Sequence, residues 1–242
     1  MPTKCSNCPL RQLDAFAPMT GAEVEFMERF KKGEFNAEIG TEIMAQGQSS
    51  THLFTCLEGM GLLYKTLQNG RRQVIGFVMP GDFVGLQAGV MAEMDHSVEA
   101  STPMKLCIFN RSELWSLFTT NPARAYDITR VAAHEERFLG EALAVVGQMD
   151  ARTRIAWALH RFYTRLVDVG MQSGSKVPLP YKQQDLADAL GLSLVHTNKT
   201  LTRLREEQIV TWMDNQLTVH NLDRLTQLAQ VDTETMVKRP II

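Results

Sequence analysis

Residues 35–110 alternate short apolar runs with glycine turns, as in the stretch HLFTCLEGMGLLYKTLQNGRRQVIGFVMPGDFVGL that begins at His52. The runs have the length of β-strands, and the triplets QNG and PGD are typical of tight turns between antiparallel strands. The pattern predicts an antiparallel sheet sandwich or roll at the N-terminus, and of the two we take a β-roll, a cupin-like jelly roll, as the fold class. We assign it to residues 1–120, with a Cys-x-x-Cys segment at its start.

Residues 121–150 change to a helical period. Apolar positions from Ala125 to Met149 are separated by alternating steps of three and four residues, which is the pattern of two helices packed side by side. Asn121 can cap this helix, and Pro122 suits its first turn. We predict a long dimerisation helix that pairs two copies of the chain through Ile128, Ala132, Glu135, Leu139, Ala142 and Val146.

The same apolar stripe has an alternative role, which is to pack on the protein's own sheet. The predicted pairing residues form a seam along the helix. This seam is flanked by Val131, Phe138 and Val145, which make the apolar face wide enough for both contacts. Glu135 interrupts the seam with a charge that either lies at a solvated end or tunes the pairing at a cost in stability. The sequence leaves these alternatives open.

Residues 151–242 begin with an amphipathic helix and a polar, proline-marked stretch. The pattern then predicts a short helix over Gln183–Leu190. Gly191 supplies a position where the chain can turn with positive φ, and Ser193 can cap a second helix over Leu194–Glu207. Two short helices across a three-residue turn form the motif whose second helix enters the major groove of DNA.

The residues of the second helix can be sorted by helical spacing. Thr197, Leu201 and Leu204 repeat at steps of four and three and should pack inward. Among outward residues, Asn can pair with adenine, Lys can donate to guanine or phosphate, and Val can contact a thymine methyl group. The residues predicted to contact DNA are Val195, Asn198, Lys199 and Thr202 on the outward face, with Ser193, His196 and Arg203 at its flanks for phosphate contacts.

The stretch IVTWMDNQLTV follows this helix and predicts two short strands about an Asp-Asn turn, a wing beside the motif. Helix-turn-helix geometry also occurs in proteins that do not bind DNA. The charge distribution favours DNA, because residues 151–242 hold 12 basic and 9 acidic residues, a net charge of +3. Residues 1–150, with 13 basic and 18 acidic residues, have a net charge of −5, so only the second part suits a polyanion.

The composition sets the class of protein. With 242 residues, 44% of them hydrophobic, the chain can bury a full core in two domains. It has no signal-peptide core and no apolar run long enough to span a bilayer, so we expect a cytoplasmic protein without a membrane partner. No nucleophile–base set, phosphate loop or metal-spaced histidine pair is present, which argues against an enzyme.

The order of these parts resembles the Crp–Fnr superfamily of bacterial transcription regulators. The roll glycines and the stretch DLADALGLSLVHTNKTLTRLREEQIV carry the resemblance, which extends over nearly the whole chain. It implies a sensory roll, a homodimer formed by the long helix, a pseudo-palindromic promoter site, and RNA polymerase as a partner if the protein is an activator. Cyclic-nucleotide binders of this family hold the phosphate with an arginine. The stretch GDFVGLQAGVMAEMDHSVEAS contains none, so we expect neither cyclic AMP nor cyclic GMP as the ligand.

The four cysteines leave three alternatives open. The oxygen-sensing branch of the family holds an iron–sulfur cluster, and the resemblance places Cys5, Cys8 and Cys107 at ligand positions, with Asp14 or an outside group in place of a missing cysteine. Zinc would need further ligands beside Cys5 and Cys8. In the third alternative, Cys56 and Cys107 are core thiols, and the N-terminal pair forms a turn without a cofactor.

We therefore predict an α+β protein with a sensory roll over residues 1–120, a dimerisation helix over 121–150 and a winged helix-turn-helix domain over 151–242. The predicted function is a homodimeric, DNA-binding transcription activator that does not respond to a cyclic nucleotide. One alternative is an iron–sulfur-dependent oxygen or redox sensor regulator. Another is a ligand- or redox-sensing module without DNA binding.

Overall fold

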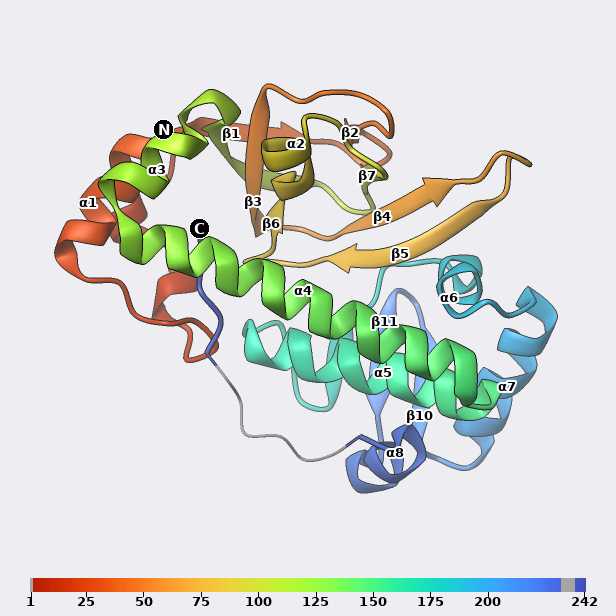
Figure 1. Cartoon of the computed structure of the whole chain (residues 1–242). Helices are drawn as coiled ribbons and strands as arrows, with labels where there is room; N and C mark the ends of the chain where they lie inside the picture. The colour runs from red at the N-terminus through yellow and green to blue at the C-terminus, as the bar shows by residue number, and fades with distance from the viewer. Residues whose placement is uncertain (1, 232–237) are drawn as a thin grey trace. The chain divides into compact units, whose positions relative to one another are not determined.

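The computed structural model describes residues 2–231 and 238–242, and it has an α+β fold with two compact units (Figure 1). The roll unit contains the described residues up to Glu135 together with residues 238–242. The winged-helix unit contains the described residues from Glu136 onwards up to 231. The predicted roll, long helix and winged helix-turn-helix are all present, so the predicted fold class is confirmed.

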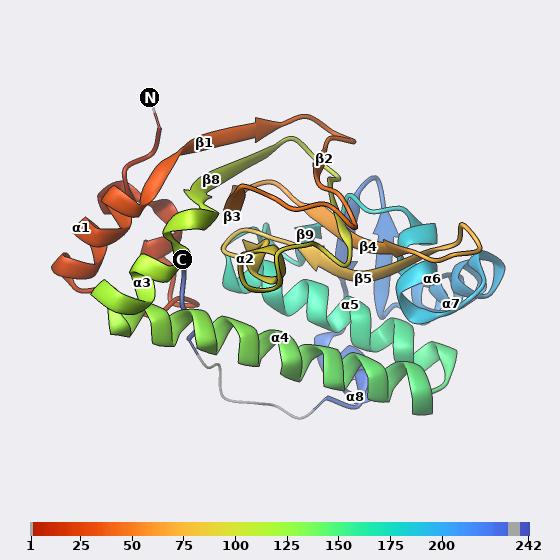
Figure 2. The same ribbon diagram turned by 45° about the horizontal axis from the view of Figure 1, so that its top comes forward.

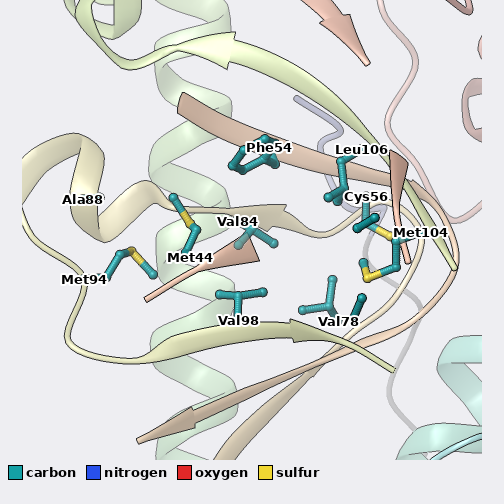
Figure 3. Packing of buried hydrophobic residues seen from close by; sticks show 12 residues of the cluster. Met44, Phe54, Cys56, Val78, Val84, Ala88, Met94, Val98, Met104 and Leu106 are labelled. Atoms are coloured by element: carbon teal, nitrogen blue, oxygen red, sulfur yellow. The ribbon is translucent and has the colours of Figure 1, made fainter. Parts of the chain in front are cut away.

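The roll consists of two antiparallel four-stranded sheets. The first has the order β1 (Lys31–Ala37), β8 (Met104–Asn110), β3 (His52–Glu58) and β6 (Phe83–Val84). The second has the order β2 (Glu42–Met44), β7 (Ser97–Ala100), β4 (Gly61–Thr66) and β5 (Arg72–Val78). Apolar side chains from both sheets meet between them, among them Phe54, Val84, Val98 and Leu106 (Figure 3). The apolar residues that face inward from both sheets therefore share one core cluster.

The two predicted turns of the roll have the expected backbone. Gly70 lies in the turn between β4 and β5 with a φ of 77°, and Gly81 has a φ of 89°. The turn at Gly81 is also held by a side chain, because the backbone N–H of Met79 donates to Asp82 Oδ2 at 2.9 Å. The first short helix after this turn is α2 (Leu86–Met91).

Helices cover one end of the roll. The short 3₁₀ turns η1 (Cys5–Asn7) and η2 (Pro9–Gln12) precede α1 (Gly21–Phe30), and η3 (Arg111–Glu113) precedes α3 (Leu114–Thr120). Thr20 caps α1 by accepting from the N–H of Glu23, whose carboxylate accepts from the N–H of Thr20. Figures 1 and 2 both show α1 beside α3, and their apolar faces share a core cluster that includes Met27, Phe30, Leu114 and Leu117.

Helix α4 (Pro122–Gln148) follows the predicted span closely, but only some of its predicted pairing residues are exposed. Ile128, one of the predicted dimerisation residues, is 3% exposed and packs in the same cluster as α1 and α3. Its inclusion among the pairing residues was therefore wrong, and the alternative of packing within the chain holds for this end of the helix. Farther along, Leu139 is 46% exposed and Leu143 is 74% exposed.

The winged-helix unit adds the second half of the fold. Its helices are α5 (Ala151–Asp168), α6 (Gln183–Leu190), α7 (Leu194–Glu206) and α8 (Leu222–Ala229). Its sheet has the order β10 (Val210–Met213), β11 (Gln216–Val219) and β9 (Lys176–Pro178). Asp150 caps α5 by accepting from the N–H of Thr153 at 2.8 Å. Among the described residues, no helix is both long enough and apolar enough to cross a membrane.

The segment Lys238–Ile242 does not belong to the winged-helix unit, although the sequence placed it in the domain 151–242. Its residue Arg239 forms an isolated parallel bridge with Phe16, and Ile241 and Ile242 are buried in the roll unit. The physical reason is that two adjacent isoleucines lose more solvent contact in the apolar cluster than on the surface. The domain boundary therefore differs from the expected one at this end of the chain.

Gly59 offers a test of the packing at the rim of the roll. Its φ is +89°, and an added Cβ would lie 2.2 Å from the Pro103 carbonyl oxygen. We expect Gly59→Ala to lower the free energy of unfolding by roughly 3 kcal/mol, the sum of backbone strain and steric overlap. Gly70→Ala is the matched control, because the φ is +77° there and no atom lies within 4 Å of the added carbon. Urea unfolding measures both, and equal losses in the two variants would contradict the packing argument.

Candidate nucleic-acid interface

The turn between α6 and α7 is built as the sequence predicts. Gly191 ends α6 with a φ of 65° and a ψ of 33°, the left-handed conformation that glycine adopts without strain. The N–H of Leu192 then donates to the Ala187 carbonyl at 3.0 Å. Ser193 starts α7, because its Oγ accepts from the N–H of His196 at 3.2 Å. These contacts fix the angle at which α7 leaves α6.

The inward face of α7 is buried as expected. Thr197 and Leu204 are fully buried, and Leu201 is nearly so. Thr200 is also buried, which the sequence reasoning did not include. The facing residues of α6 are Leu186, Ala187 and Leu190, all of them buried. A packed inner face of this kind holds α7 rigidly and leaves its other face to solvent.

The outward face of α7 presents the side chains predicted to contact DNA. Val195 is 79% exposed, so its methyl groups are accessible on this face. All seven predicted residues are exposed: Ser193, Val195, His196, Asn198, Lys199, Thr202 and Arg203. The structure thus brings them together on one accessible surface, while their contacts with DNA stay a prediction.

Sequence reasoning missed Arg205 on the same helix. It is exposed and follows Asn198 by seven residues and Thr202 by three, so all three lie on one face. Extending the same spacing by one step would have found it. Lys182, at the start of α6, is a second exposed cation that the prediction omitted. Both add positive charge to the helix-turn-helix.

The predicted wing is present beside these helices. Strands β10 and β11 pair from Val210 with Val219 to Met213 with Gln216, and the turn between them has positive φ at Asp214 and Asn215. This is the backbone that a two-residue hairpin turn requires. The Trp212 Nε1–H donates to the Leu179 carbonyl at 3.0 Å and anchors the hairpin to the chain before α6.

Two arginines of α5 contact the C-terminal ends of the two helices of the helix-turn-helix. Arg154 Nη1 donates to the Leu190 carbonyl at 3.1 Å, which satisfies a carbonyl at the end of α6. Arg152 forms an ion pair with Glu207, directly after α7. Arg152 and Arg154 thus have partners within the unit. The exposed cations of α7, which are Lys199, Arg203 and Arg205, are accessible for binding DNA.

Comparisons with known proteins agree with this architecture. Residues 153–228 match the model of the Crp-like helix-turn-helix domain, and residues 29–121 match that of the cyclic nucleotide-binding domain. The nitrogen fixation regulation protein FixK of Rhizobium meliloti is 32% identical over 186 residues, which cover 72% of this chain and 76% of that protein. The chain belongs to the Crp–Fnr family of transcription regulators.

Two further similarities extend the family match over most of the chain. The transcriptional activatory protein AadR of Rhodopseudomonas palustris is 26% identical over 226 residues, which cover 93% of this chain and 92% of that protein. The solved structure of FixK2 from Bradyrhizobium japonicum has a TM-score of 0.73 at 25% identity, and the match covers 83% of this chain and 98% of FixK2. These relatives are regulators rather than enzymes.

The roll of this Crp–Fnr protein matches the cyclic nucleotide-binding domain model, and its interior contains an apolar core cluster. Met44, Met94 and Met104 are among the buried hydrophobic residues that fill it (Figure 3). The Ser97 hydroxyl accepts from the N–H of Gln46, and burial lowers the pKa of His96, which favours its neutral form. Neither residue supplies the cation that a phosphate needs. The absence of a cyclic nucleotide stays a prediction.

The structure brings Cys5, Cys8 and Cys107 to one cavity in the roll unit. Cys56 is not among the lining residues. Its neighbours Thr55 and Leu57 on β3 line the cavity, whereas Cys56 packs in the core cluster between the two sheets. Asp14 does not line the cavity either, and its side chain is 98% exposed. Three of the four ligands considered for a cluster therefore converge, and the fourth does not.

The chemistry of these thiols bears on the cluster hypothesis. Burial raises the pKa of Cys5 to about 11 and also raises that of Cys107, so both favour the protonated thiol. Metal ligation requires thiolates. Among the described residues, no group of three His, Cys, Asp or Glu side chains is arranged to hold a metal ion. These residues do not complete a four-ligand cluster site, and the metal site stays a prediction.

Proposed function

We propose that the protein is a homodimeric transcription activator whose two copies of α7 bind a pseudo-palindromic promoter site. The observation that carries this proposal is the division of α7 into a buried apolar face and an exposed polar face. The half-sites would lie about one helical turn, or 10 base pairs, apart. The similarity to the transcriptional activatory protein AadR supports activation rather than repression, and RNA polymerase would then be a partner.

The exposed side chains of α7 suggest distinct roles at the DNA. Asn198 can pair with adenine through its amide, and Lys199 can donate to guanine in the major groove. The exposed methyl groups of Val195 suit the methyl group of thymine. Thr202 lies on the same outward face. Ser193, His196 and Arg203 flank these positions and would contact mainly the phosphate backbone, which orients the protein without selecting a sequence.

The pairing of two copies is proposed through the exposed stretch of α4. Ala132, Leu139 and Leu143 are exposed at helical spacing, and Ala142 and Val146 are half-buried beside them. The proposed seam differs from the sequence prediction in two residues, because it leaves out Ile128 and includes Leu143. The other predicted residues remain in it: Ala132, Glu135, Leu139, Ala142 and Val146. An exposed aliphatic stripe on a long helix favours burial against an equivalent helix.

The first test measures sequence recognition by α7. A duplex selected from a random-sequence library by the wild-type protein serves as the specific site. Lys199→Ala should weaken its binding about tenfold, as expected for the loss of roughly 1–3 kcal/mol of base discrimination. Binding to an unrelated duplex should fall much less. Arg224→Ala on α8 removes an exposed cation of the same unit and is the matched control.

The outcomes of this titration separate the alternatives. Wild-type affinity should fall steeply as salt rises, because phosphate contacts release counterions. Equal losses on both duplexes would assign Lys199 to phosphate contact. Failure to select any duplex would contradict the proposed function and favour a sensing module without DNA binding.

The second test concerns the dimer. Leu143→Glu places two carboxylates within the proposed seam, and we expect the dimer dissociation constant to rise at least about 100-fold, since unpaired charges are costly to bury. Leu67→Glu, at an exposed position of the β4–β5 hairpin, is the control with the same change of charge. Sedimentation equilibrium measures both, and a Leu143→Glu variant that stays dimeric would place the interface elsewhere.

An iron–sulfur-dependent sensor regulator remains the second candidate, because Cys5, Cys8 and Cys107 line one cavity. It needs a fourth ligand from outside the described cavity residues. Protein purified without oxygen should then contain iron and show visible absorbance that Cys107→Ser removes and Cys56→Ser retains. Iron-free, colourless protein would contradict this candidate and leave the DNA-binding proposal unaffected.

A further inference from the structure

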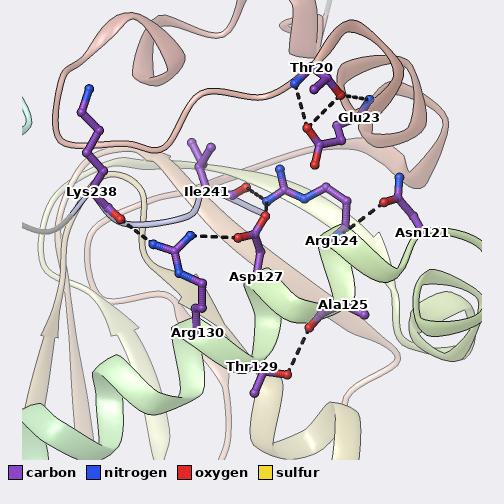
Figure 4. A network of polar contacts seen from close by, with 10 residues as sticks. All are labelled: Thr20, Glu23, Asn121, Arg124, Ala125, Asp127, Thr129, Arg130, Lys238 and Ile241. Atoms are coloured by element: carbon purple, nitrogen blue, oxygen red, sulfur yellow. Dashed lines mark hydrogen bonds and ion pairs between the residues drawn. The ribbon is translucent and has the colours of Figure 1, made fainter.

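The segment Lys238–Ile242 is held by the roll unit along most of its length (Figure 4). Arg130 Nη2 donates to the Lys238 carbonyl at 2.8 Å. The N–H of Arg239 donates to the Ala15 carbonyl at 2.9 Å, and its carbonyl accepts from the N–H of Ala17 at 2.8 Å. This is the main-chain pairing by which an extended peptide binds to a protein surface.

Side chains of the segment are recognised as well. Arg239 Nη1 lies 3.1 Å from Asp82 Oδ1, and its guanidinium lies over the ring of Phe16. Ile241 and Ile242 are 4% and 5% exposed and line the cavity that contains the three cysteines. The Thr55 hydroxyl donates to the Ile242 backbone oxygen. A basic residue on the rim and two aliphatic residues inside define a specific peptide site.

Arg124 makes this site sensitive to the presence of the segment. It is 2% exposed, pairs with Asp127 at 2.6 Å and donates to the Ile241 carbonyl at 3.1 Å (Figure 4). Burying a guanidinium is costly unless its donors are satisfied, and Nε of Arg124 has no partner among the described residues. Undocking would return this charge to water, which offsets part of the loss of apolar contact. The docked and undocked arrangements are thus closer in free energy than the apolar contacts alone would make them.

The connectivity of the chain gives this docking a consequence outside the roll unit. The winged-helix unit joins the roll unit through α4 at one end and through the residues that follow α8 at the other. The docked segment therefore closes the chain into a loop that contains the DNA-binding helices. Closing a loop lowers the conformational entropy of the chain that connects its ends.

We propose that Lys238–Ile242 is a regulatory strap, a tethered peptide ligand of the roll unit whose docking and release change the DNA affinity of the winged-helix unit. The proposal rests on the proposed function for its DNA readout and on the contacts above for its docking. Because the strap is tethered, docking is intramolecular and independent of protein concentration. Thermodynamic linkage then requires that DNA binding change the docking equilibrium by the same factor.

The experiment releases the strap in the full-length protein by Arg239→Glu, which sets a carboxylate beside Asp82. Hydrogen exchange followed by mass spectrometry should show at least tenfold faster exchange in peptides containing residues 238–242 and Ala17. Arg224→Glu, the same charge change on α8, should leave both peptides protected. Ile242→Asp is a second releasing variant that acts through the apolar contacts instead. Melting temperatures verify that every variant is folded.

The DNA readout uses the duplex selected by the wild-type protein. We expect both releasing variants to change its dissociation constant at least threefold, in the same direction. In the wild-type protein, adding the duplex should change strap exchange by the corresponding factor. Faster exchange with unchanged affinity would overturn the strap proposal, as would strap protection that neither variant reduces. A wild-type protein that selects no duplex would contradict the proposed function while leaving the measured docking intact.

Discussion

Helix α4 contributes residues to the cores of both units, and the rest of the structure depends on this double packing. At its first turns, Ile128 packs into the roll unit, and Arg124 is buried there beside Asp127. At its far end, Phe138 stacks on Trp157 of α5, and Val145 is buried. The two ends of one continuous helix therefore pack in two different cores. The exposed seam between these anchors is where we propose that a second copy pairs.

The local parts of the fold could be predicted because their signals are short-range. A glycine turn between strands and a serine cap after Gly191 depend on a few adjacent residues, and Thr197, Leu201 and Leu204 were placed correctly by spacing alone. The pairing seam was harder. A stripe that packs inside the chain and one that pairs with a copy share the same period, so Ile128 could not be told from Leu139. Exposure in the folded chain was needed to separate them.

Non-local features were beyond reach for a different reason. Ile241 and Ile242 form a two-residue apolar pair without a period, and nothing near them in sequence indicates the cluster they join. The convergence of Cys5, Cys8 and Cys107 was expected only from family resemblance, because more than 90 residues separate the third cysteine from the pair. The exposed position of Asp14 could not be foreseen either. Each depends on the packing of segments that no local pattern connects.

The division of the roll unit into two stretches of sequence also affects how the protein is made. Residues that complete its core follow residues 136–236 in the chain, so they leave the ribosome after the whole winged-helix unit. At synthesis rates of 5–20 residues per second, that delay lasts roughly 5–20 s. During this interval the cluster that receives Ile242 stays open and Arg124 lacks its carbonyl acceptor. The roll unit is synthesised first, yet its last core residues become available only after the whole winged-helix unit has been made.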